Sequence, residues 1–506
     1  MHKKQVDIIV IGSGIGGLTS AGLLAKAGKK VLLLEQHDRA GGYAHGFKRK
    51  KYYFDAGVHL TSGCGATGYQ GGQLIAKTLD ALNVSEQVSF ISINPFAHIS
   101  LADISFDLPQ SMDAFVLEAG KVFPTEQQGL RDLLALCFAV TEQAAQADDL
   151  MRNVATGTVP AELTLLFQYR YHTLAEVWGD FITEPQLKSI FAALWPYLGL
   201  PPTEVSFVYW ANMLIGYLED GAYYCQGGFQ NLADALVAGL LKAGGEIRLK
   251  ASVNQIKVID NQVQGVQLAT GEFIHANTVI SNADMRHTVH QLVGDAHFPK
   301  RYLSRLARMQ VSQSIFVVYI ATDLDMQQAG AHHEAFYYQD YDHEKNYQTS
   351  CNAELSWLSI TVPTLVDPSL APQGEHLVML TSLVSFDQYP DWKQEKAAFT
   401  EKMLDFADTK IAGLKAHILF IDAGSPTTLQ RYTLNDKGAA YGWAASPQQT
   451  GAMRAANKAP ITGLYFAGHW TTPGGGVYGA SYSGVQTAQT ILGLNKQADL
   501  WTISNE

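Results

Sequence analysis

Short apolar runs, each closed by glycine or by an acidic residue, mark the first 35 residues of the chain. The run from Val6 to Ile11 predicts a buried strand, and the run from Leu18 to Ala27 predicts a helix that ends at Gly28. The continuous run from Val31 to Leu34 predicts a second strand, buried on both faces as in a parallel sheet. Strand, helix and parallel strand in this order favour an α/β fold.

Further along the chain, apolar spacing predicts another helix and several short strands. The helix covers 231–243 and is followed by two glycines. A longer apolar run predicts a strand at 314–320, and the C-terminal segment 463–492 repeats the plan of strand, glycine loop and helix. Alternating apolar positions separated by turn residues predict a small β-meander with strands at 246–249, 253–258, 263–268 and 273–281.

The turn between the first predicted strand and helix carries a glycine pattern, Gly12-Ser13-Gly14-Ile15-Gly16-Gly17, and Glu35 lies eighteen residues beyond it. The first glycine allows the bend, Gly14 lets the backbone approach a pyrophosphate, and Gly17 lets the helix pack close to the strand. The helix N-terminus offers unpaired N–H groups to phosphates, and Glu35, with Gln36 beside it, would accept hydrogen bonds from a ribose. This Rossmann-type unit predicts a bound dinucleotide and leaves FAD and NAD open.

Composition narrows the class of protein. The chain has 506 residues, enough for two domains, and 36 Lys and Arg against 47 Asp and Glu give a net charge of −11. With no long basic run, this charge argues against a nucleic-acid partner and against simple electrostatic docking on anionic lipid. Only 16% of the residues are charged and 47% are hydrophobic, which indicates extensive burial or an apolar surface or channel.

Neither a signal peptide nor a membrane span is predicted. Two lysines precede the first apolar run, but that run continues into the glycine turn without a cleavage site. No other stretch has the roughly eighteen apolar residues of a spanning helix. The four cysteines lie far apart without a CxxC pair, which favours free thiols in a reducing compartment. We therefore expect a cytoplasmic protein, and its apolar composition leaves a peripheral contact with a membrane open.

A second glycine pattern follows Glu35. It contains Asp38, then Gly41 and Gly42, and leads to Phe54-Asp55-Ala56-Gly57-Val58-His59. Acid, short spacer, paired glycines and Phe-Asp-x-Gly resemble the FAD oxidoreductases that include phytoene desaturases, carotenoid isomerases and retinol saturases. The resemblance implies FAD as the cofactor, with Gly41 and Gly42 against its pyrophosphate and ribityl chain. A histidine at position 59 most resembles the retinol saturase branch.

Two later segments extend the resemblance. The family's backbone contact to adenine would fall on Val253. The run from Gly463 to Ala480 resembles the family's closing motif, in which a proline and glycines lie beneath the isoalloxazine. A glycine loop entering a helix N-terminus can also stabilise negative charge on the reduced ring. His469 departs from the pattern, because many relatives have an acid there that binds the ribityl chain, although a neutral imidazole can still accept one hydrogen bond. The remaining flavin contacts implied in this run are Gly468, Gly475, Gly476 and Val477.

Three motifs near positions 12, 41 and 468 can meet only in a discontinuous domain. We predict a Rossmann-type FAD-binding domain formed by 1–75, 220–295 and 425–506. The remainder, 76–219 and 296–424, would form an α+β substrate domain inserted twice into it. Dense aromatic and aliphatic residues in 187–218 predict a packed helical core, with an apolar tunnel or a membrane-touching surface as the alternative.

The activity that the resemblance implies is flavin chemistry on carbon–carbon double bonds of a long apolar, conjugated substrate. Desaturation, saturation and cis–trans isomerisation stay open, and so does the electron partner, because a second nucleotide fingerprint is missing. His59 and Tyr478 lie inside the flavin motifs and are the candidates for proton transfer or polarisation. No nucleophilic triad is predicted. No metal site is predicted either, because neither His332-His333 nor the pair His287 and His290 has convincing partner ligands.

Two other functions stay open. An amine-oxidising flavoenzyme of the same fold is weakened by the absence of Gly-Gly-Arg after Glu35. A flavin-free carrier is the other, since the GDP dissociation inhibitors of prenylated GTPases share this architecture, but the three intact flavin motifs count against it. Purified protein with the absorption bands of oxidised flavin would exclude the carrier.

Overall fold

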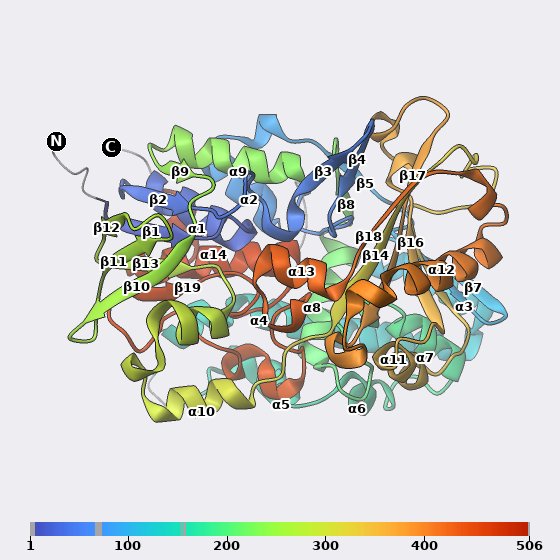
Figure 1. Ribbon diagram of the computed structural model, residues 1–506. Coiled ribbons are helices and arrows are strands. Elements are labelled where there is room, and N and C mark those ends of the chain that lie inside the picture. Colours follow the sequence, from blue (N-terminus) through green and yellow to red (C-terminus); the bar gives the residue numbers. More distant parts are fainter. Residues whose placement is uncertain (1–5, 66–72, 153, 155–157, 504–506) are drawn as a thin grey trace.

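Two large β-sheets organise the computed structural model, which describes residues 6–65, 73–152, 154 and 158–503. In Figure 1 the first sheet lies on the left and the second on the right. All four strand pairs of the first sheet are parallel. In spatial order its strands are β19 (Leu464–Phe466), β13 (Thr278–Ser281), β1 (Ile8–Ile11), β2 (Val31–Leu34) and β9 (Glu246–Arg248).

The parallel sheet is covered on both faces, as parallel sheets require. Side chains alternate along β1, so that Ile8 and Val10 pack in the core of α1 (Ile15–Lys26), whereas Ile9 and Ile11 pack with the strands on the opposite side. Helices α9 (Gln230–Lys242) and α14 (Gly476–Leu492) flank α1. The predicted βαβ unit of the N-terminal segment is confirmed in type and order.

The opposite face carries a three-stranded antiparallel meander, β10 (Val253–Ile259), β11 (Gln262–Leu268) and β12 (Phe273–His275). The expected fourth strand at 246–249 is wrong as a meander strand, because Glu246–Arg248 pairs in parallel with β2. The expected strand at 273–281 divides in two, since its second half is β13 of the parallel sheet. The chain thus returns to the parallel sheet on both sides of the meander.

The second sheet is mostly antiparallel and has one parallel pair, β15 with β6. Its strand order is β18 (Ile418–Gly424), β14 (Ser314–Thr322), β17 (His376–Val384), β16 (Trp357–Thr361), β15 (Glu334–Tyr338), β6 (Ala97–Leu101) and β7 (Ile104–Leu108). The strand predicted at 314–320 is β14, and it also alternates. Phe316 and Val318 pack in the cluster under α12 (Trp392–Lys410), whereas Ile315, Val317 and Tyr319 line a large cavity.

Two small strand pairs complete the sheets: the hairpin β3 (Gly46–Arg49) and β4 (Tyr52–Asp55), and the pair β5 (Phe90–Ser92) and β8 (Tyr223–Cys225). The remaining helices are α2 (Leu74–Ala81), α3 (Met112–Val122), α4 (Gln127–Arg152), α5 (Thr164–Tyr169), α6 (Leu174–Trp178), α7 (Pro185–Ala192), α8 (Phe207–Glu219), α10 (Lys300–Arg308), α11 (His343–Cys351), α13 (Pro426–Thr433) and α15 (Ala498–Trp501).

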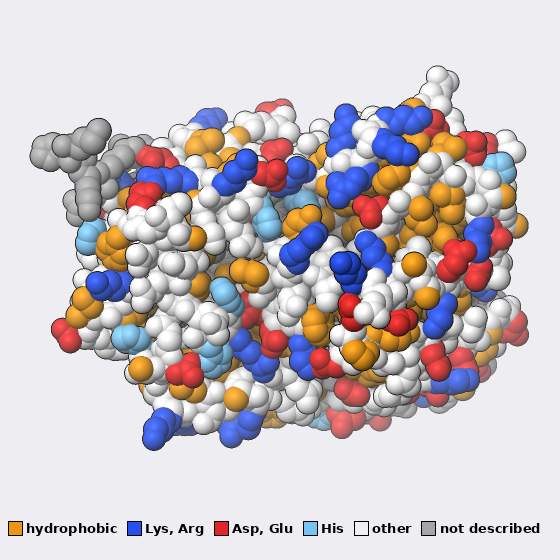
Figure 2. Space-filling model, in the orientation of Figure 1, with side chains coloured by type: hydrophobic (Ala, Val, Ile, Leu, Met, Phe, Trp, Pro, Cys, Tyr) orange, Lys and Arg blue, Asp and Glu red, His pale blue; other side chains and the backbone are white. Residues whose placement is uncertain are grey.

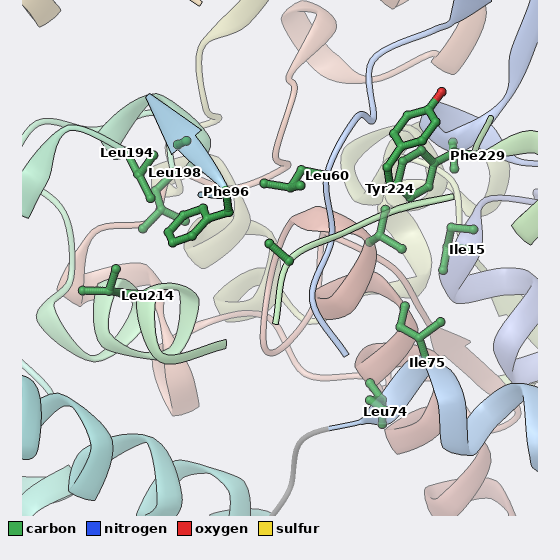
Figure 3. Packing of buried hydrophobic residues seen from close by; sticks show 14 of the residues in the cluster. Ile15, Leu60, Leu74, Ile75, Phe96, Leu194, Leu198, Leu214, Tyr224 and Phe229 are labelled. Atoms are coloured by element: carbon green, nitrogen blue, oxygen red, sulfur yellow. The ribbon is translucent and has the colours of Figure 1, made fainter. Parts of the chain in front are cut away.

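One hydrophobic core runs from α1 to the helices of the middle segment. In Figure 3, Leu194 and Leu198 lie close to Phe96, Tyr224 and Phe229 lie near Ile15, and Leu60 lies between the two groups. This continuous core connects the two sheets, although the predicted domain bounds stay a prediction.

No helix in the described ranges is long and apolar enough to cross a membrane. Basic and acidic side chains are both spread over the face in Figure 2, with hydrophobic ones between them.

Candidate functional site

A cavity of about 1430 Å³ runs between the parallel sheet and the seven-stranded sheet. Every residue that the sequence predicted for the cofactor or for proton transfer lines this cavity, apart from Gly17. Gly17 lies buried beneath the turn, where an added Cβ would be 2.2 Å from the carbonyl oxygen of Gly12. The fold therefore brings the two N-terminal glycine motifs, Val253 and the loop from Gly468 to one site, although about two hundred residues separate Gly42 from Val253 and Val253 from Gly468.

Backbone packing between the glycine motifs builds one end of the cavity. The N–H of Gly41 donates to the carbonyl of Ser13 at 2.9 Å, and Gly14 and Gly41 form an isolated bridge. Gly42 has φ +58° and packs on Gly14, so that an added Cβ would lie 2.9 Å from the Gly14 Cα. The first turn of α1 has no side-chain cap, which leaves its N–H groups directed at this end of the cavity.

Asn282 is a site residue that the sequence reasoning missed. Its N–H donates to the carbonyl of Ile11 at 2.9 Å. Its side chain lies within 2.7 Å of a Cβ built on Gly14 and within 2.4 Å of one built on Gly468. Asn282 thus fills the space between the first and the last glycine motif. The sequence predicts a strand at 273–281, and no local pattern distinguishes the asparagine directly after it from an ordinary loop residue.

Glu35 is buried at the end of β2, as predicted, and closes the glycine turn. Its carboxylate accepts hydrogen bonds from the Ser13 N–H at 2.8 Å, the Ser13 hydroxyl at 2.6 Å and the His37 N–H at 2.9 Å. Gln36 and Val253 lie at the same end of the cavity. The role of these residues toward a nucleotide stays a prediction.

Replacing Glu35 with alanine should weaken flavin binding about tenfold and destabilise the fold by about 1–3 kcal/mol, since two backbone N–H groups lose their acceptor. Equilibrium titration of the apoprotein with flavin and thermal unfolding would measure both effects. Asp38→Ala is the matched control, because Asp38 is an exposed acid on the same rim whose partner is Arg39. Equal flavin affinities in the two variants would contradict the role of Glu35.

The other end of the cavity is formed by the loop that leads into α14. Gly475 is the N-cap of this 17-residue helix and supplies no side-chain cap. His469 is half-buried at the cavity wall, and desolvation, reinforced by nearby Arg454, lowers its pKa to about 3. A neutral imidazole can accept a hydrogen bond on one nitrogen, and the Asn435 amide lies 3.4 Å from its Nε2. The second helix N-terminus therefore faces the cavity beside an uncharged histidine.

Beyond the glycine motifs the cavity is lined by apolar and aromatic side chains. They come from the inner face of the seven-stranded sheet and from the segment predicted as either helical core or tunnel. In that segment Leu194, Trp195 and Trp210 are fully buried core, whereas Tyr197 and Tyr209 line the cavity. The segment is therefore largely helical core, and some of its side chains also line the cavity. The other principal apolar lining residues are Leu198, Met213, Tyr217, Phe336 and Leu383.

A buried ion pair lies against this apolar part. His59 Nε2 is 3.1 Å from the Glu334 carboxylate, and their side chains are 11% and 0% exposed. Ser359 and Thr361 donate hydroxyl hydrogen bonds to the same carboxylate at 3.0 and 2.8 Å. Burial is the largest influence on each pKa and opposes ionisation, but the attraction and hydrogen bond within the pair outweigh it. The pKa of His59 is raised and that of Glu334 is lowered, so each partner favours the charged form of the other.

The other polar groups of the second motif have a different position. Asp55 of the Phe-Asp-x-Gly sequence accepts hydrogen bonds from the Tyr224 hydroxyl and the Phe229 N–H, each at 2.7 Å. It therefore connects the β3–β4 hairpin to β8 and α9 behind the cavity.

Tyr478, the second candidate for proton transfer, belongs to the C-terminal motif. It lies in the first turn of α14 with its ring against Gly63.

Within the described residues, His98, Asp107 and His332 form a group with nitrogen and oxygen atoms less than 4.8 Å apart. The rings of His98 and His332 stack 3.9 Å apart at an interplanar angle of 3°. Parallel rings point their lone pairs side by side and not at a common point, so this arrangement favours stacking over chelation. All four cysteines are free thiols, as predicted.

One cavity contains both a Rossmann-type nucleotide unit and a second uncapped helix N-terminus. These two features identify a dinucleotide-binding fold of the kind found in enzymes. The chain belongs to the family of flavin-containing amine oxidoreductases, whose family model matches residues 15–492. The resemblance found in the motifs is confirmed at the level of the family, and the chain is a flavin-dependent oxidoreductase.

Curated relatives cover nearly the whole chain. Prolycopene isomerase 1 of an Oncidium hybrid cultivar is 28% identical over 98% of this chain and 86% of its own. Phytoene desaturase (lycopene-forming) of Pseudescherichia vulneris is 28% identical over 96% of this chain and 98% of its own. All-trans-retinol 13,14-reductase of Danio rerio is 25% identical, with coverages of 92% and 82%.

A solved oxidoreductase from Methanosarcina mazei shares the fold. It superposes with a TM-score of 0.65 at 18% identity, over 96% of this chain and all of the other. The predicted α/β architecture of the amine-oxidase type is confirmed by this likeness together with the family match.

Proposed function

We propose that the chain binds FAD and uses it to transfer hydrogen to or from carbon–carbon bonds of a long apolar, conjugated substrate. The observation that carries this proposal is the shape of the cavity, because one chamber joins the glycine motifs to an apolar compartment. Its volume of about 1430 Å³ exceeds the roughly 300–1,000 Å³ of ordinary ligand sites, as a dinucleotide and a second molecule together require. The relatives named above act on prolycopene, phytoene and retinol, which agrees with an apolar polyene.

The residues present fit FAD. Gly14, Gly41 and Gly42 form a cradle where side chains would fill the space of a pyrophosphate, and the uncapped N-terminus of α1 supplies N–H donors for it. Glu35, Gln36 and Val253 would hold the adenosine end. Gly468, His469 and the loop 475–477 would hold the other end against α14. When bound, the flavin supplies the two-electron chemistry by accepting or giving a hydride.

In this proposal His59 handles the proton. A buried imidazolium beside Glu334 can donate a proton to a substrate carbon, and the neutral imidazole that remains can take one from it in the reverse direction. The carboxylate fixes which nitrogen is engaged and keeps the ring charged, so Glu334 acts as a positioning residue. Tyr478 is the second candidate, as a hydroxyl at the α14 end of the same cavity.

The ion pair also favours a polyene over an amine as the substrate. An amine substrate brings a positive charge, which would need an unpaired carboxylate in the apolar compartment. Glu334 is already neutralised by His59 and is fully buried. The apolar aromatic lining instead fits a chain without charge, since each buried apolar group contributes favourable transfer free energy.

The proposal is tested by identifying the cofactor and the altered lipid. We expect purified protein to release FAD on denaturation, as measured by mass spectrometry. Lipid extracts of cells with and without the gene should differ in one conjugated compound, either by two hydrogens or by double-bond geometry. Hydrogen peroxide formation with amines, together with unchanged lipid extracts, would contradict the proposal and support amine oxidation.

A further inference from the structure

Arg454 is a buried cation to which the proposed reaction assigns no role. Its side chain is 2% exposed, and within the described residues its guanidinium donates to backbone carbonyls alone. The acceptors are those of Thr471 at 2.9 Å, Gln449 at 3.3 Å, Tyr441 at 3.2 Å and His469 at 2.6 Å. These carbonyls belong to the loops that support the α14 end of the cavity.

Within the part of the chain that the structure describes, no carboxylate forms an ion pair with Arg454. Tyr209 and His469 are the titratable groups beside it. Burial raises the pKa of Tyr209 and lowers that of His469 to about 3, so both are neutral near pH 7. Burial lowers the pKa of Arg454 itself to about 10, which still leaves it charged.

A buried charge without a partner costs free energy. A neutral donor would be enough to hydrogen-bond to these carbonyls. Gln449 illustrates the cheaper solution, since its neutral amide donates to the carbonyls of Gln310 and Ala444 in the same region. The charge of Arg454 therefore indicates a negative partner that the chain itself does not supply. In a low-dielectric interior such a partner can stabilise the charge across an intervening loop, although the attraction falls with distance.

The position of Arg454 says where that partner would lie. A Cβ built on Gly474 would be 3.3 Å from the guanidinium carbon, so only the glycine loop separates Arg454 from the cavity lining at 475–477. Glu35 and the N-terminus of α1 hold the adenosine and pyrophosphate end in the proposed function, so the loop at 475–477 adjoins the ring end of the dinucleotide. The uncapped N-terminus of α14 adds a positive dipole end there.

We propose that Arg454 stabilises the negative charge that the bound flavin ring gains on reduction. This inference rests on the proposed function. A hydride brings two electrons and one proton to the oxidised ring and leaves it with one negative charge, while the substrate is oxidised and then loses a proton. Arg454 touches neither molecule, so it acts through the field across the loop and raises the reduction potential of the flavin.

The test compares two variants that separate charge from hydrogen bonding. Arg454→Lys keeps the charge and loses most donors, whereas Arg454→Gln keeps an amide donor and loses the charge. We expect the flavin midpoint potential of Arg454→Gln to fall by about 30 mV or more, the two-electron equivalent of a tenfold change, and that of Arg454→Lys to stay near the wild-type value. Sulfite, which forms an anionic flavin adduct, should bind about tenfold more weakly to Arg454→Gln alone.

Arg286→Gln is the matched control, because Arg286 also donates to two backbone carbonyls but already pairs with Asp436. The flavin midpoint potential of Arg286→Gln should equal that of the wild type. Equal shifts in both Arg454 variants would show a merely structural role and overturn the inference. If neither variant folds, sulfite binding to the wild-type protein tests the inference instead. The flavin of the wild type should then bind sulfite at least about tenfold more tightly than free FAD does. Flavin binding with an unshifted potential overturns only this inference, whereas a wild type that takes up no flavin overturns the proposed function with it.

Discussion

Replacing Gly16 with alanine should lower the flavin content of the purified chain more than tenfold and destabilise the fold by about 3 kcal/mol. The new Cβ would lie 2.6 Å from the Gly468 nitrogen, 2.7 Å from its Cα and 2.8 Å from the Ala480 carbonyl oxygen. These are backbone atoms of the loop and helix that close the cavity, so they cannot rotate away. The α1 helix would move off the C-terminal motif, and the two ends of the cofactor site would separate. The flavin-to-protein absorbance ratio and thermal unfolding measure both effects.

Gly22→Ala is the control for this prediction, because it makes the same change in the same helix. A Cβ at Gly22 would meet the Leu82 Cδ1 at 2.9 Å, and that atom is the end of a side chain that can rotate. Alanine also favours the helix by about 0.5–1 kcal/mol over glycine, so this variant should keep its flavin and nearly all of its stability. Equal flavin losses in the two variants would contradict a role of the contact between Gly16 and Gly468.

Replacing Glu334 with glutamine should reduce the turnover number about a hundredfold above pH 7, the usual scale of losing one acid–base group. Glutamine keeps the shape of the side chain but removes the charge that raises the pKa of His59. Burial is the largest influence on His59, and with the Glu334 charge gone it lowers that pKa relative to the wild type. A reaction that needs protonated His59 is lost as pH rises through the pKa, so the variant should lose activity at a lower pH than the wild type. The pH dependence of the turnover number measures this shift.

Glu375→Gln is the control for charge removal, since Glu375 pairs with Lys51 at the surface. Surface pairs contribute about 0–1 kcal/mol, so its pH profile should match that of the wild type. His59→Ala should abolish the high-pH limb altogether. Identical pH profiles in wild type and Glu334→Gln would remove His59 from the proton-transfer role and leave Tyr478 as the remaining candidate.

The N-terminal βαβ unit and the convergence of three glycine motifs are predictable from the sequence, because local patterns determine them. A strand, a glycine turn and a helix leave few alternatives, and the motifs can bind one dinucleotide only if the chain brings them together. The three-residue strand at 246–248 is not predictable in the same way. Periodicity cannot distinguish a parallel from an antiparallel partner for so short a strand. Only its pairing with β2 in the structure shows that the strand is parallel.

Glu334, Asn282 and Arg454 escape sequence reasoning for a related reason. Each is a polar residue whose role depends on a partner far away in the chain, as with Glu334 on β15 and His59 in the loop after β4. A buried charge is costly without its partner, so its presence becomes informative only once the fold shows what surrounds it. The glycine motifs of the cofactor site can therefore be predicted from local sequence patterns. The charged groups around the apolar part of the cavity can be recognised only from tertiary contacts.

The most direct test of the central claim is a single-turnover measurement without oxygen. Holoenzyme, in the oxidised form and separately in the reduced form, is mixed with a conjugated polyene or with putrescine while the flavin absorbance is followed. We expect a stoichiometric change in flavin absorbance, or a change in polyene geometry without net flavin change, with the polyene alone. Flavin reduction by putrescine, with neither flavin nor polyene altered in the other mixture, would contradict the assignment to carbon–carbon chemistry.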